Sequence, residues 1–276
     1  MQSFGQRLRT FLQQPDAKQR PVRALVRRVY WKLFKALRPN AIYHRKNWYR
    51  GMAILIPQSG TAAQIFYRDI SDQATVDFIN ESLRPGMVFV DIGAHAGEYS
   101  LIAAQLVGST GRVVAVEPQE HCANVIRKNF SINHFAWGQV GCYALDSSSG
   151  KAAFLIDKAT SGGTLDKIGR FDENVVLTDT CTLDEMFRRE RMQSADVIKL
   201  DAGGNEYGVL LAAESYMRSA KAPTLIVKFY NSNDIKARFG HDAEDLRVLL
   251  TEWGFSLRGN FDGYAPSILA IPPRPL

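Results

Sequence analysis

Apolar runs of strand length alternate with segments of helical period along most of this chain, and that alternation constrains the fold more than any other feature. Four runs are apolar on both faces of the strand that each predicts: MVFVDIG, RVVAVEP, DVIKLD and TLIVKFY. Segments in which apolar residues recur every three or four residues, as in a helix, precede or separate these runs. They lie near residues 73–83, 99–106, 120–130, 206–213 and 243–252. Strands separated by helices form a parallel sheet that helices cover on both faces.

The remaining strands complete the predicted sheet. Two final strands, FSLRG and SILAIP, have no helix between them and predict a last strand that runs antiparallel. The third strand is expected at GCYALD, which ends at Asp146. Residues 147–191 are less regular and contain SGGT, so we expect a long loop over the carboxyl edge of the sheet. The predicted fold is a doubly wound, mostly parallel α/β sheet.

Charge divides the chain into two parts. Residues 1–50 hold 13 Lys and Arg against one acid, whereas the rest of the chain has 27 acids and 21 bases. We predict a basic N-terminal helical extension over residues 1–50 and a mildly acidic domain over residues 51–276. No apolar run has membrane-spanning length, and the start lacks the apolar core of a signal peptide, so we expect a cytoplasmic protein. Three cysteines without CxxC spacing argue against a disulfide framework and structural zinc.

Residues 20–39 predict an amphipathic helix within the basic extension. Pro21 suits its first turn and Pro39 follows its end. One face is apolar and comprises Val22, Leu25, Val26, Val29, Tyr30, Leu33, Phe34 and Leu37. Three roles stay open for it: packing within the protein or in a dimer, attachment to an anionic membrane surface that would make the protein peripheral to the membrane, and nucleic-acid binding, the least favoured.

A glycine turn follows the first strand and indicates a cofactor site. Residues 91–100 read DIGAHAGEYS, so the glycines have DxGxxxG spacing instead of the GxGxxG of a dinucleotide fold. The acids Asp91 and Glu98 would repel a pyrophosphate placed on the helix N-terminus. They would attract a cofactor that carries an ammonium and a sulfonium. S-adenosylmethionine, with S-adenosylhomocysteine as its product, fits that description.

Position assigns roles within this site. Gly93 and Gly97 allow close backbone approach, and Asp91 supplies negative charge near the methionine end of the cofactor. Glu117 ends the second strand and is placed to accept both ribose hydroxyls. His95 is either a cofactor contact or a turn residue. The candidate cofactor residues are Asp91, Gly93, Ala94, His95, Gly97, Tyr99, Ser100, Glu117 and Pro118.

These segments together resemble the FkbM family of S-adenosylmethionine-dependent methyltransferases, over residues 67–253. The resemblance rests on the order and spacing of YRDISDQATVDFINESLRPGMVFVDIGAHAGEYSLIAAQLVGSTGRVVAVEP, ALD, SGGT, TCTLDEM and VIKLDAGGNE. It implies a class I, Rossmann-like methyltransferase fold and, as is usual in the family, methylation of a hydroxyl on a sugar, polyketide or similar secondary metabolite. It also implies cofactor contacts by Asp91, Gly93, His95, Gly97 and Glu117, with Asp146 near the adenine.

Two positions depart from the family pattern. Family members usually read IKIDVEGAE where this chain reads IKLDAGGNE, so Gly203 stands in place of a glutamate. The next strand usually ends in an acid, and Lys228 stands there instead. A cation would favour an anionic acceptor, and we therefore assign Lys228, Gly203 and Asn205 to acceptor binding. The substitution Lys228→Glu is expected to impair use of the acceptor without weakening cofactor binding.

The catalytic base is expected just after the strand DVIKL. A hydroxyl acceptor has to lose a proton, which calls for a base or a metal. Asp201 is the first choice, and Glu206, whose acid would also complement a helix dipole, is the second. A magnesium site of Asp201 with Asn231, Asn233 or Asp234 is a weaker alternative, and no metal is assigned.

Three functions stay open from the sequence. The first is an O-methyltransferase that acts on a hydroxyl of a sugar, glycan or secondary-metabolite-like small molecule. The second is a partner or regulatory protein that binds S-adenosylmethionine with weak or absent chemistry, because two acids of the family pattern are missing. The third is a methyltransferase that acts on a macromolecule recruited by the basic extension.

Overall fold

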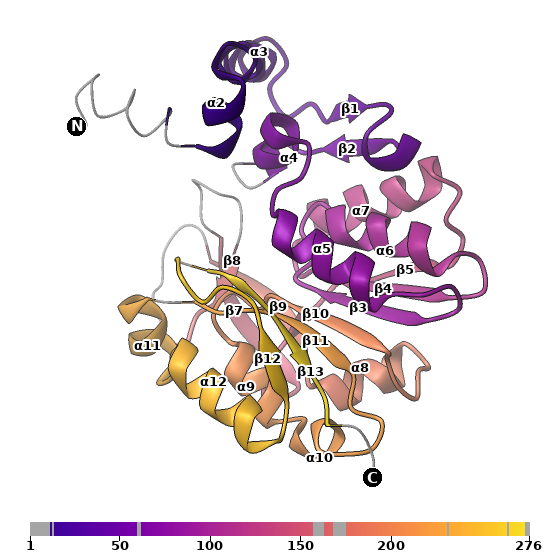
Figure 1. The fold of residues 1–276 in the computed structure, drawn as a ribbon, viewed down its shortest axis with the longest axis vertical. Helices are drawn as coiled ribbons and strands as arrows, with labels where there is room; N and C mark the ends of the chain where they lie inside the picture. The colour runs from indigo at the N-terminus through magenta and orange to yellow at the C-terminus, as the bar shows by residue number, and fades with distance from the viewer. Residues whose placement is uncertain are drawn as a thin grey trace. The chain divides into compact units, whose positions relative to one another are not determined.

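A seven-stranded sheet forms the centre of the larger of two compact units in the computed structural model (Figure 1). One unit extends up to Ser71 and the other begins at Asp72. The structure describes residues 12, 14–59, 62–156, 163–167, 175–230, 232–263 and 265–273. The sheet order is β12-β13-β11-β10-β3-β4-β5. These strands are β3 (Val88–Ile92), β4 (Arg112–Val116), β5 (Gly138–Gly141), β10 (Val197–Leu200), β11 (Thr224–Lys228), β12 (Ser256–Arg258) and β13 (Ser267–Ile271).

Strand directions confirm the predicted sheet. The strands β5, β4, β3, β10 and β11 are parallel, and β13 runs antiparallel to both β11 and β12. Every residue of β10 is buried, and so are all but the first of β3 and β4. Burial on both faces explains why these strands read as continuous apolar runs instead of alternating ones.

Helices cover both faces of the sheet (Figure 1). The helices α5, α6 and α7 lie on one side, and α9, α10 and α12 lie on the other. The five helices α5, α6, α7, α9 and α12 coincide with those predicted from the sequence, and α8, α10 and α11 are additional. Their bounds are α5 (Gln73–Ser82), α6 (Glu98–Val107), α7 (Glu120–Ile132), α8 (Leu183–Arg189), α9 (Glu206–Leu211), α10 (Glu214–Met217), α11 (Asn233–Phe239) and α12 (Ala243–Glu252).

A second, four-stranded sheet replaces the long loop expected over residues 147–191. Its order is β6-β9-β7-β8. The strands are β6 (Ala144–Leu145), β7 (Gly150–Ile156), β8 (Gly163–Leu165) and β9 (Val175–Cys181). The expected loop was wrong because only one residue of β7 and three of β9 are buried, so these strands lack the continuous burial of the central strands. The third central strand was also misplaced, since it ends at Gly141, and Asp146 follows β6 instead.

The N-terminal unit contains the predicted amphipathic helix, here α3 (Pro21–Leu37). Its other elements are α2 (Pro15–Gln19), β1 (Tyr43–Arg45), η1 (Tyr49–Gly51), β2 (Ile54–Ile56) and α4 (Ala62–Arg68). The helix α3 packs within the unit through the buried side chains of Ala24 and Trp31. Within the described ranges, no helix combines the length and hydropathy needed to cross a bilayer.

Candidate functional site

The loop after β10 and the first residue of α9 carry the two acids predicted to be catalytic, Asp201 and Glu206. Tyr230 Oη donates to Asp201 Oδ1 at 2.6 Å. Glu206 Oε1 accepts the backbone N–H groups of Ala202 and Gly204 at 2.6 and 3.1 Å. Burial, and then the charge of Asp201, raises the pKa of Glu206 to about 8. At neutral pH Glu206 is therefore mostly protonated and holds the loop, whereas Asp201 keeps 25% of its side chain exposed.

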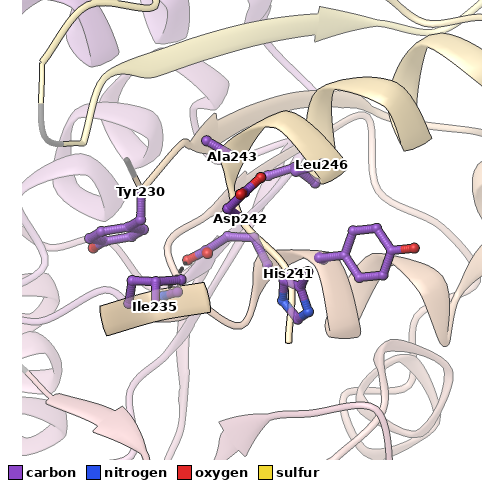
Figure 2. Close-up of a pocket in the computed structure, with 9 residues that line it drawn as sticks. Tyr230, Ile235, His241, Asp242, Ala243 and Leu246 are labelled. Atoms are coloured by element: carbon purple, nitrogen blue, oxygen red, sulfur yellow. Dashed lines mark hydrogen bonds between the residues drawn. The ribbon is translucent and has the colours of Figure 1, made fainter. Parts of the chain in front are cut away.

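A small pocket lies behind this loop and is too narrow for an acceptor. Figure 2 shows Tyr230, Ile235 and His241 around it. Its volume of about 10 Å³ is near the least that one water molecule needs. The ring of Tyr230 therefore lines a space that has no room for a substrate, while its hydroxyl binds Asp201.

Gly203, the departure from the resembled family, makes room for β8. Thr164 Oγ1 donates to the carbonyl oxygen of Gly203 at 2.8 Å. A Cβ added to Gly203, whose φ is +66°, would lie 2.5 Å from the carbonyl oxygen of Gly163. A glutamate at this position would collide with the β8 backbone. Packing of β8 against the loop therefore accounts for the glycine at position 203. The role of Gly203 in acceptor binding stays a prediction.

The turn between β3 and α6 lies against β4 and against the loop after β10. The N–H groups of Gly93 and Ala94 donate to the carbonyl oxygen of Val116 at 2.9 and 3.1 Å. A Cβ added to Gly93, whose φ is +72°, would lie 1.9 Å from the carbonyl oxygen of Asp201. Glycine is thus required here because two loops approach each other closely.

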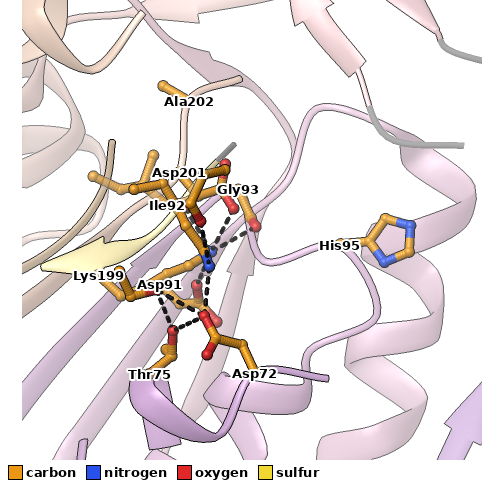
Figure 3. Close-up of polar contacts among 12 residues, drawn as sticks. Asp72, Thr75, Asp91, Ile92, Gly93, His95, Lys199, Asp201 and Ala202 are labelled. Atoms are coloured by element: carbon orange, nitrogen blue, oxygen red, sulfur yellow. Dashed lines mark hydrogen bonds and ion pairs between the residues drawn. The ribbon is translucent and has the colours of Figure 1, made fainter. Parts of the chain in front are cut away.

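Lys199 joins these two loops by charge (Figure 3). Its ammonium lies 3.2 Å from Asp91 Oδ1 and 3.9 Å from Asp201 Oδ2. It also donates to the carbonyl oxygens of Ile92 and Gly93 at 3.2 and 2.9 Å. Burial opposes the charge of the lysine, but the two carboxylates outweigh burial and raise the pKa of Lys199. The ammonium therefore stays protonated in the interior.

Three predicted cofactor residues gather around Lys199. Asp91 is fully buried, and Ser100 Oγ donates to its Oδ2 at 2.6 Å. The ring centroid of Tyr99 lies 5.4 Å from Lys199 Nζ. Lys199 was not among the residues predicted for the site, although its place inside the apolar run VIKL was a signal, because a buried ammonium needs a partner.

Glu117 is the second buried acid of the cofactor turn. Its carboxylate accepts the N–H groups of His95 and Gln119, both at 2.9 Å. Burial raises the pKa of Glu117 to about 7 in spite of these bonds. Further hydroxyl donors would stabilise such a carboxylate, which fits the predicted contact with a ribose. Pro118 directly follows it, at the bend into α7.

His95 and Gly97 shape the start of α6. Both have positive φ angles, +49° and +79°. A Cβ on Gly97 would lie 3.1 Å from the side chain of Ile126. Burial, and then the nearby charges of His121 and Lys199, lowers the pKa of His95 to about 4, so its imidazole is neutral at pH 7. Figure 3 shows its ring apart from the cluster around Lys199. Whether it contacts a cofactor stays a prediction.

Asp146 is bound within a network at the edge of the small sheet. Its Oδ1 accepts from Asn205 Nδ2 at 3.0 Å, and its Oδ2 pairs with the ammonium of Lys167. Asp146 and Asn205 are both buried. Two candidate residues, one assigned to the cofactor and one to the acceptor, therefore contact each other. The contact of Asp146 with an adenine stays a prediction.

A cavity of about 470 Å³ opens beside this network, within the size range of small-molecule pockets. The side chain of Arg238 is 6% exposed, and its Nη2 binds Asp234 Oδ2 at 3.1 Å. Its Nε and Nη1 have no hydrogen-bond partner among the residues that the structure describes. The cavity wall includes Ser147, Lys167, Asn205, Tyr207, Arg238, Phe239 and His241. Arg238 therefore lies in the cavity wall, with its Nε and Nη1 buried from solvent.

Lys228, assigned to the acceptor, is engaged elsewhere. Its ammonium lies 2.6 Å from Asp72 Oδ2, which also accepts from Thr75 and Ser267. The charge of Lys228 is therefore already balanced in this structure. Its predicted contact with an acceptor stays a prediction.

The magnesium alternative lies partly beyond the described residues. Asn231 is outside them, as are Ser161 and Gly162 of the SGGT sequence. In the described part of the chain, no group of three or more His, Cys, Asp and Glu is placed to hold a metal ion.

Residues 91–257 match the family described as "Methyltransferase FkbM domain". A search of curated proteins finds no match.

Similar solved structures include two methyltransferases and a fibrillarin. An O-methyltransferase from Bacillus cereus, in complex with S-adenosylhomocysteine, is 16% identical and covers 78% of this chain and 87% of its own, with a TM-score of 0.47. A precorrin-6y C5,15-methyltransferase from Geobacter metallireducens is 12% identical, with coverages of 73% and 87% and a TM-score of 0.45. Aeropyrum pernix fibrillarin, with bound S-adenosyl-L-methionine, is 10% identical, with coverages of 85% and 83% and a TM-score of 0.45.

Proposed function

The chain belongs to the FkbM methyltransferase family and has a class I, Rossmann-like fold, and on this premise we propose that it methylates a hydroxyl of a sugar or secondary-metabolite-like small molecule. S-adenosylmethionine supplies an electrophilic methyl group on its sulfonium and leaves as S-adenosylhomocysteine. The observation that carries the proposal is the meeting of Asp91, Lys199 and Asp201, because it joins the cofactor turn to the candidate base.

The residues of the turn fit this cofactor. Glu117 is buried, accepts two backbone N–H groups and has a raised pKa, so hydroxyls of a ribose would complete its bonding. Asp91 is also buried but is already paired with Lys199. We assign the ribose to Glu117 and the methionine end to the Asp91 side of the turn.

Asp201 is better suited than Glu206 to take the proton of the acceptor. Burial and the charge of Asp201 raise the pKa of Glu206 to about 8, so at neutral pH Glu206 already holds a proton. Its Oε1 also fixes the N–H groups of Ala202 and Gly204. Asp201 is partly exposed, and Tyr230 orients its carboxylate. We therefore assign the base to Asp201 and loop positioning to Glu206.

The cavity beside Asn205 is our candidate for the acceptor site. Its volume suits a small molecule, and the cationic residue Arg238 is part of its wall. A guanidinium in the wall favours an acceptor that carries a carboxylate or phosphate. Arg238 thus replaces Lys228, whose ammonium is balanced by Asp72, as the first candidate for acceptor recognition.

Calorimetric titration of the full chain with S-adenosylhomocysteine tests the cofactor, and methyl transfer to a panel of hydroxylated small molecules tests the reaction. Glu117→Gln is expected to weaken binding of S-adenosylhomocysteine at least about tenfold, because a charged acceptor is lost. Arg238→Met is expected to raise the KM for the acceptor and leave this binding unchanged. Arg247→Met, at an exposed arginine paired with Glu244, is the matched control.

Two results would overturn the proposal. Absence of binding at millimolar S-adenosylhomocysteine would remove the cofactor and with it the reaction. Binding without transfer to any hydroxylated small molecule, together with transfer to RNA or protein, would assign the enzyme to a macromolecular acceptor.

A further inference from the structure

The helix α3 is held in its unit by one face only. Ala24 and Trp31, two helical turns apart, are its buried residues. The Trp31 ring stacks on Phe66 of α4 with centroids 4.9 Å apart and meets the edge of Tyr43 at 6.2 Å. This aromatic contact anchors α3 against α4 and β1.

Ion pairs reinforce the same face. Arg27 Nη1 lies 2.9 Å from Asp69 Oδ1, and Arg28 Nη1 lies 2.6 Å from Asp16 Oδ2. All four side chains are at least partly buried. Two arginines of this helix are therefore bound in ion pairs within the unit. The face of α3 that packs against the unit thus consists of aromatic and basic side chains and not of aliphatic ones.

The aliphatic face of α3 points the other way. At 3.6 residues per turn, its six large aliphatic residues fall within an arc of about 120°, centred about 180° from Ala24 and Trp31. No charged residue of the helix falls inside the arc. Each side chain is between 49% and 79% exposed. They are Val22, Leu25, Val26, Val29, Leu33 and Leu37. We call this set the aliphatic arc.

Cations border the aliphatic arc on both sides. Lys32 falls next to Leu25 at one margin, and Arg23 falls beyond Leu37 at the other. Both are exposed. The helix contains no acid, and Tyr30, 49% exposed, lies between the arc and Arg23. Long cationic side chains at such margins extend toward lipid headgroups while the apolar residues enter the boundary of the acyl chains.

We propose that the aliphatic arc of α3 docks the protein on an anionic membrane surface, with the helix lying in the plane of the headgroups. An amphipathic stripe of this width normally faces a protein core, yet here the core contact is made by the opposite face. An exposed aliphatic surface with cationic margins matches an apolar layer covered by anionic groups in both hydrophobicity and charge.

The composition of the arc and its margins disfavours two other binding partners, a second copy of the chain and a nucleic acid. A symmetric contact with a second copy would bring the margins of two arcs together, and every margin residue named here is cationic or neutral. Nucleic acid would engage the cations through its phosphates but would leave the aliphatic residues in water.

Vesicle flotation of the full chain tests this proposal. One vesicle population contains phosphatidylcholine alone, and the other contains phosphatidylcholine and phosphatidylglycerol in equal parts. The protein is expected to float with the mixed vesicles only and to be released as salt increases. The triple variant Leu25→Ser, Val29→Ser, Leu33→Ser is expected to lower the partition coefficient at least about tenfold, because three exposed apolar side chains are lost.

A matched control separates the arc from apolar exposure in general. Leu177 in β9 is 77% exposed, and Leu177→Ser is expected to leave flotation unchanged. Equal flotation of the triple variant and the wild type, or no flotation of either, overturns the proposal. So does a dimer in light scattering that the triple variant abolishes, since it would give the arc to a second copy. Binding of an RNA or DNA oligonucleotide without vesicle binding would assign the cations to nucleic acid.

Discussion

Lys199 and Asp91 face each other as register partners of the parallel strands β10 and β3, and their charged atoms lie 3.2 Å apart in the interior. Each side chain is at most 3% exposed. A buried pair of this kind contributes little net stability when complete, since both charges have lost water. Loss of one partner is costly, because the other is left uncompensated. The pair therefore makes the cofactor turn and the loop of the candidate base depend on one another.

The first prediction concerns this pair. Lys199→Met is expected to lower the free energy of unfolding by about 3–5 kcal/mol, because Asp91 remains buried without its cation. Urea denaturation measures the change. The double variant Lys199→Met, Asp91→Asn is expected to recover a large part of the loss, since no charge is then left unpaired. A double variant as unstable as the sum of the two single variants would show that the ion pair is not the cause.

The second prediction concerns the pH dependence set by Glu117. The folded protein raises the pKa of this acid from 4.5 to about 7, so the folded state binds the proton more tightly than the unfolded state. Stability therefore falls as pH rises from 4.5 to about 7, and the loss is complete above pH 7. Glu117→Gln cannot ionise and should remove about 3 kcal/mol of this decline. Denaturation curves of both proteins between these pH values measure the difference.

The pKa of Glu206 is also raised, but Glu206 is present in both the wild type and Glu117→Gln. The difference between their slopes of stability against pH therefore reports on Glu117 alone. Parallel stability curves for wild type and Glu117→Gln would contradict the assignment. The same variant should bind S-adenosylhomocysteine more weakly while being more stable above pH 7. A purely structural role for Glu117 would not produce these opposite changes.

The third prediction concerns the glycine that replaces the glutamate of the family pattern. Gly203→Glu is not expected to restore an acid to the site, because its Cβ would meet the carbonyl oxygen of Gly163 at 2.5 Å. Gly203→Ala should be destabilised for the same reason. Gly240 is the matched control, with φ +80° and nothing within 4 Å of an added Cβ.

Gly240→Ala should cost only the left-handed backbone strain, about 1–2 kcal/mol. Gly203→Ala should cost about 1–3 kcal/mol more, because it adds a collision to the same strain. Thermal or urea unfolding of the three variants measures both amounts. Equal losses for the two alanine variants would remove the collision as the reason for the glycine.

The sequence was sufficient for the central sheet except for β5, because strands buried on both faces leave continuous apolar runs and the helices between them leave a clear period, whereas β5 is only partly buried. It failed over residues 147–191, since β7 and β9 mix exposed with buried residues and lack the continuous burial of the central strands. The glycine turn predicted one cofactor site with Asp91, Ser100 and Glu117, and this assignment stays a prediction. The sequence could not indicate Arg238 or the pairing of Lys228 with Asp72, because such contacts depend on which side chains meet across the fold.

The aliphatic arc illustrates a different limit. The spacing in residues 21–39 predicted an apolar face on a helix, and that helix is confirmed as α3. Spacing could not indicate which face docks, because Trp31 and Ala24 lie among the arginines in the helical projection. Two of those arginines pair with Asp16, which lies in the preceding helix α2, and with Asp69, which follows α4. Tertiary contacts therefore decided the orientation.

The last prediction separates the candidate base from its neighbours. Asp201→Asn is expected to lower kcat by about 10²–10⁴-fold, because the acceptor hydroxyl loses its proton acceptor. Tyr230→Phe should lower kcat about tenfold, since the hydroxyl that orients Asp201 is removed. Neither variant should change the affinity for S-adenosylhomocysteine. Tyr216→Phe is the matched control, because that hydroxyl accepts from the backbone of Ala195 instead. If Glu206→Gln abolished transfer while Asp201→Asn retained it, the base would be Glu206, and Asp201 would serve only to pair with Lys199.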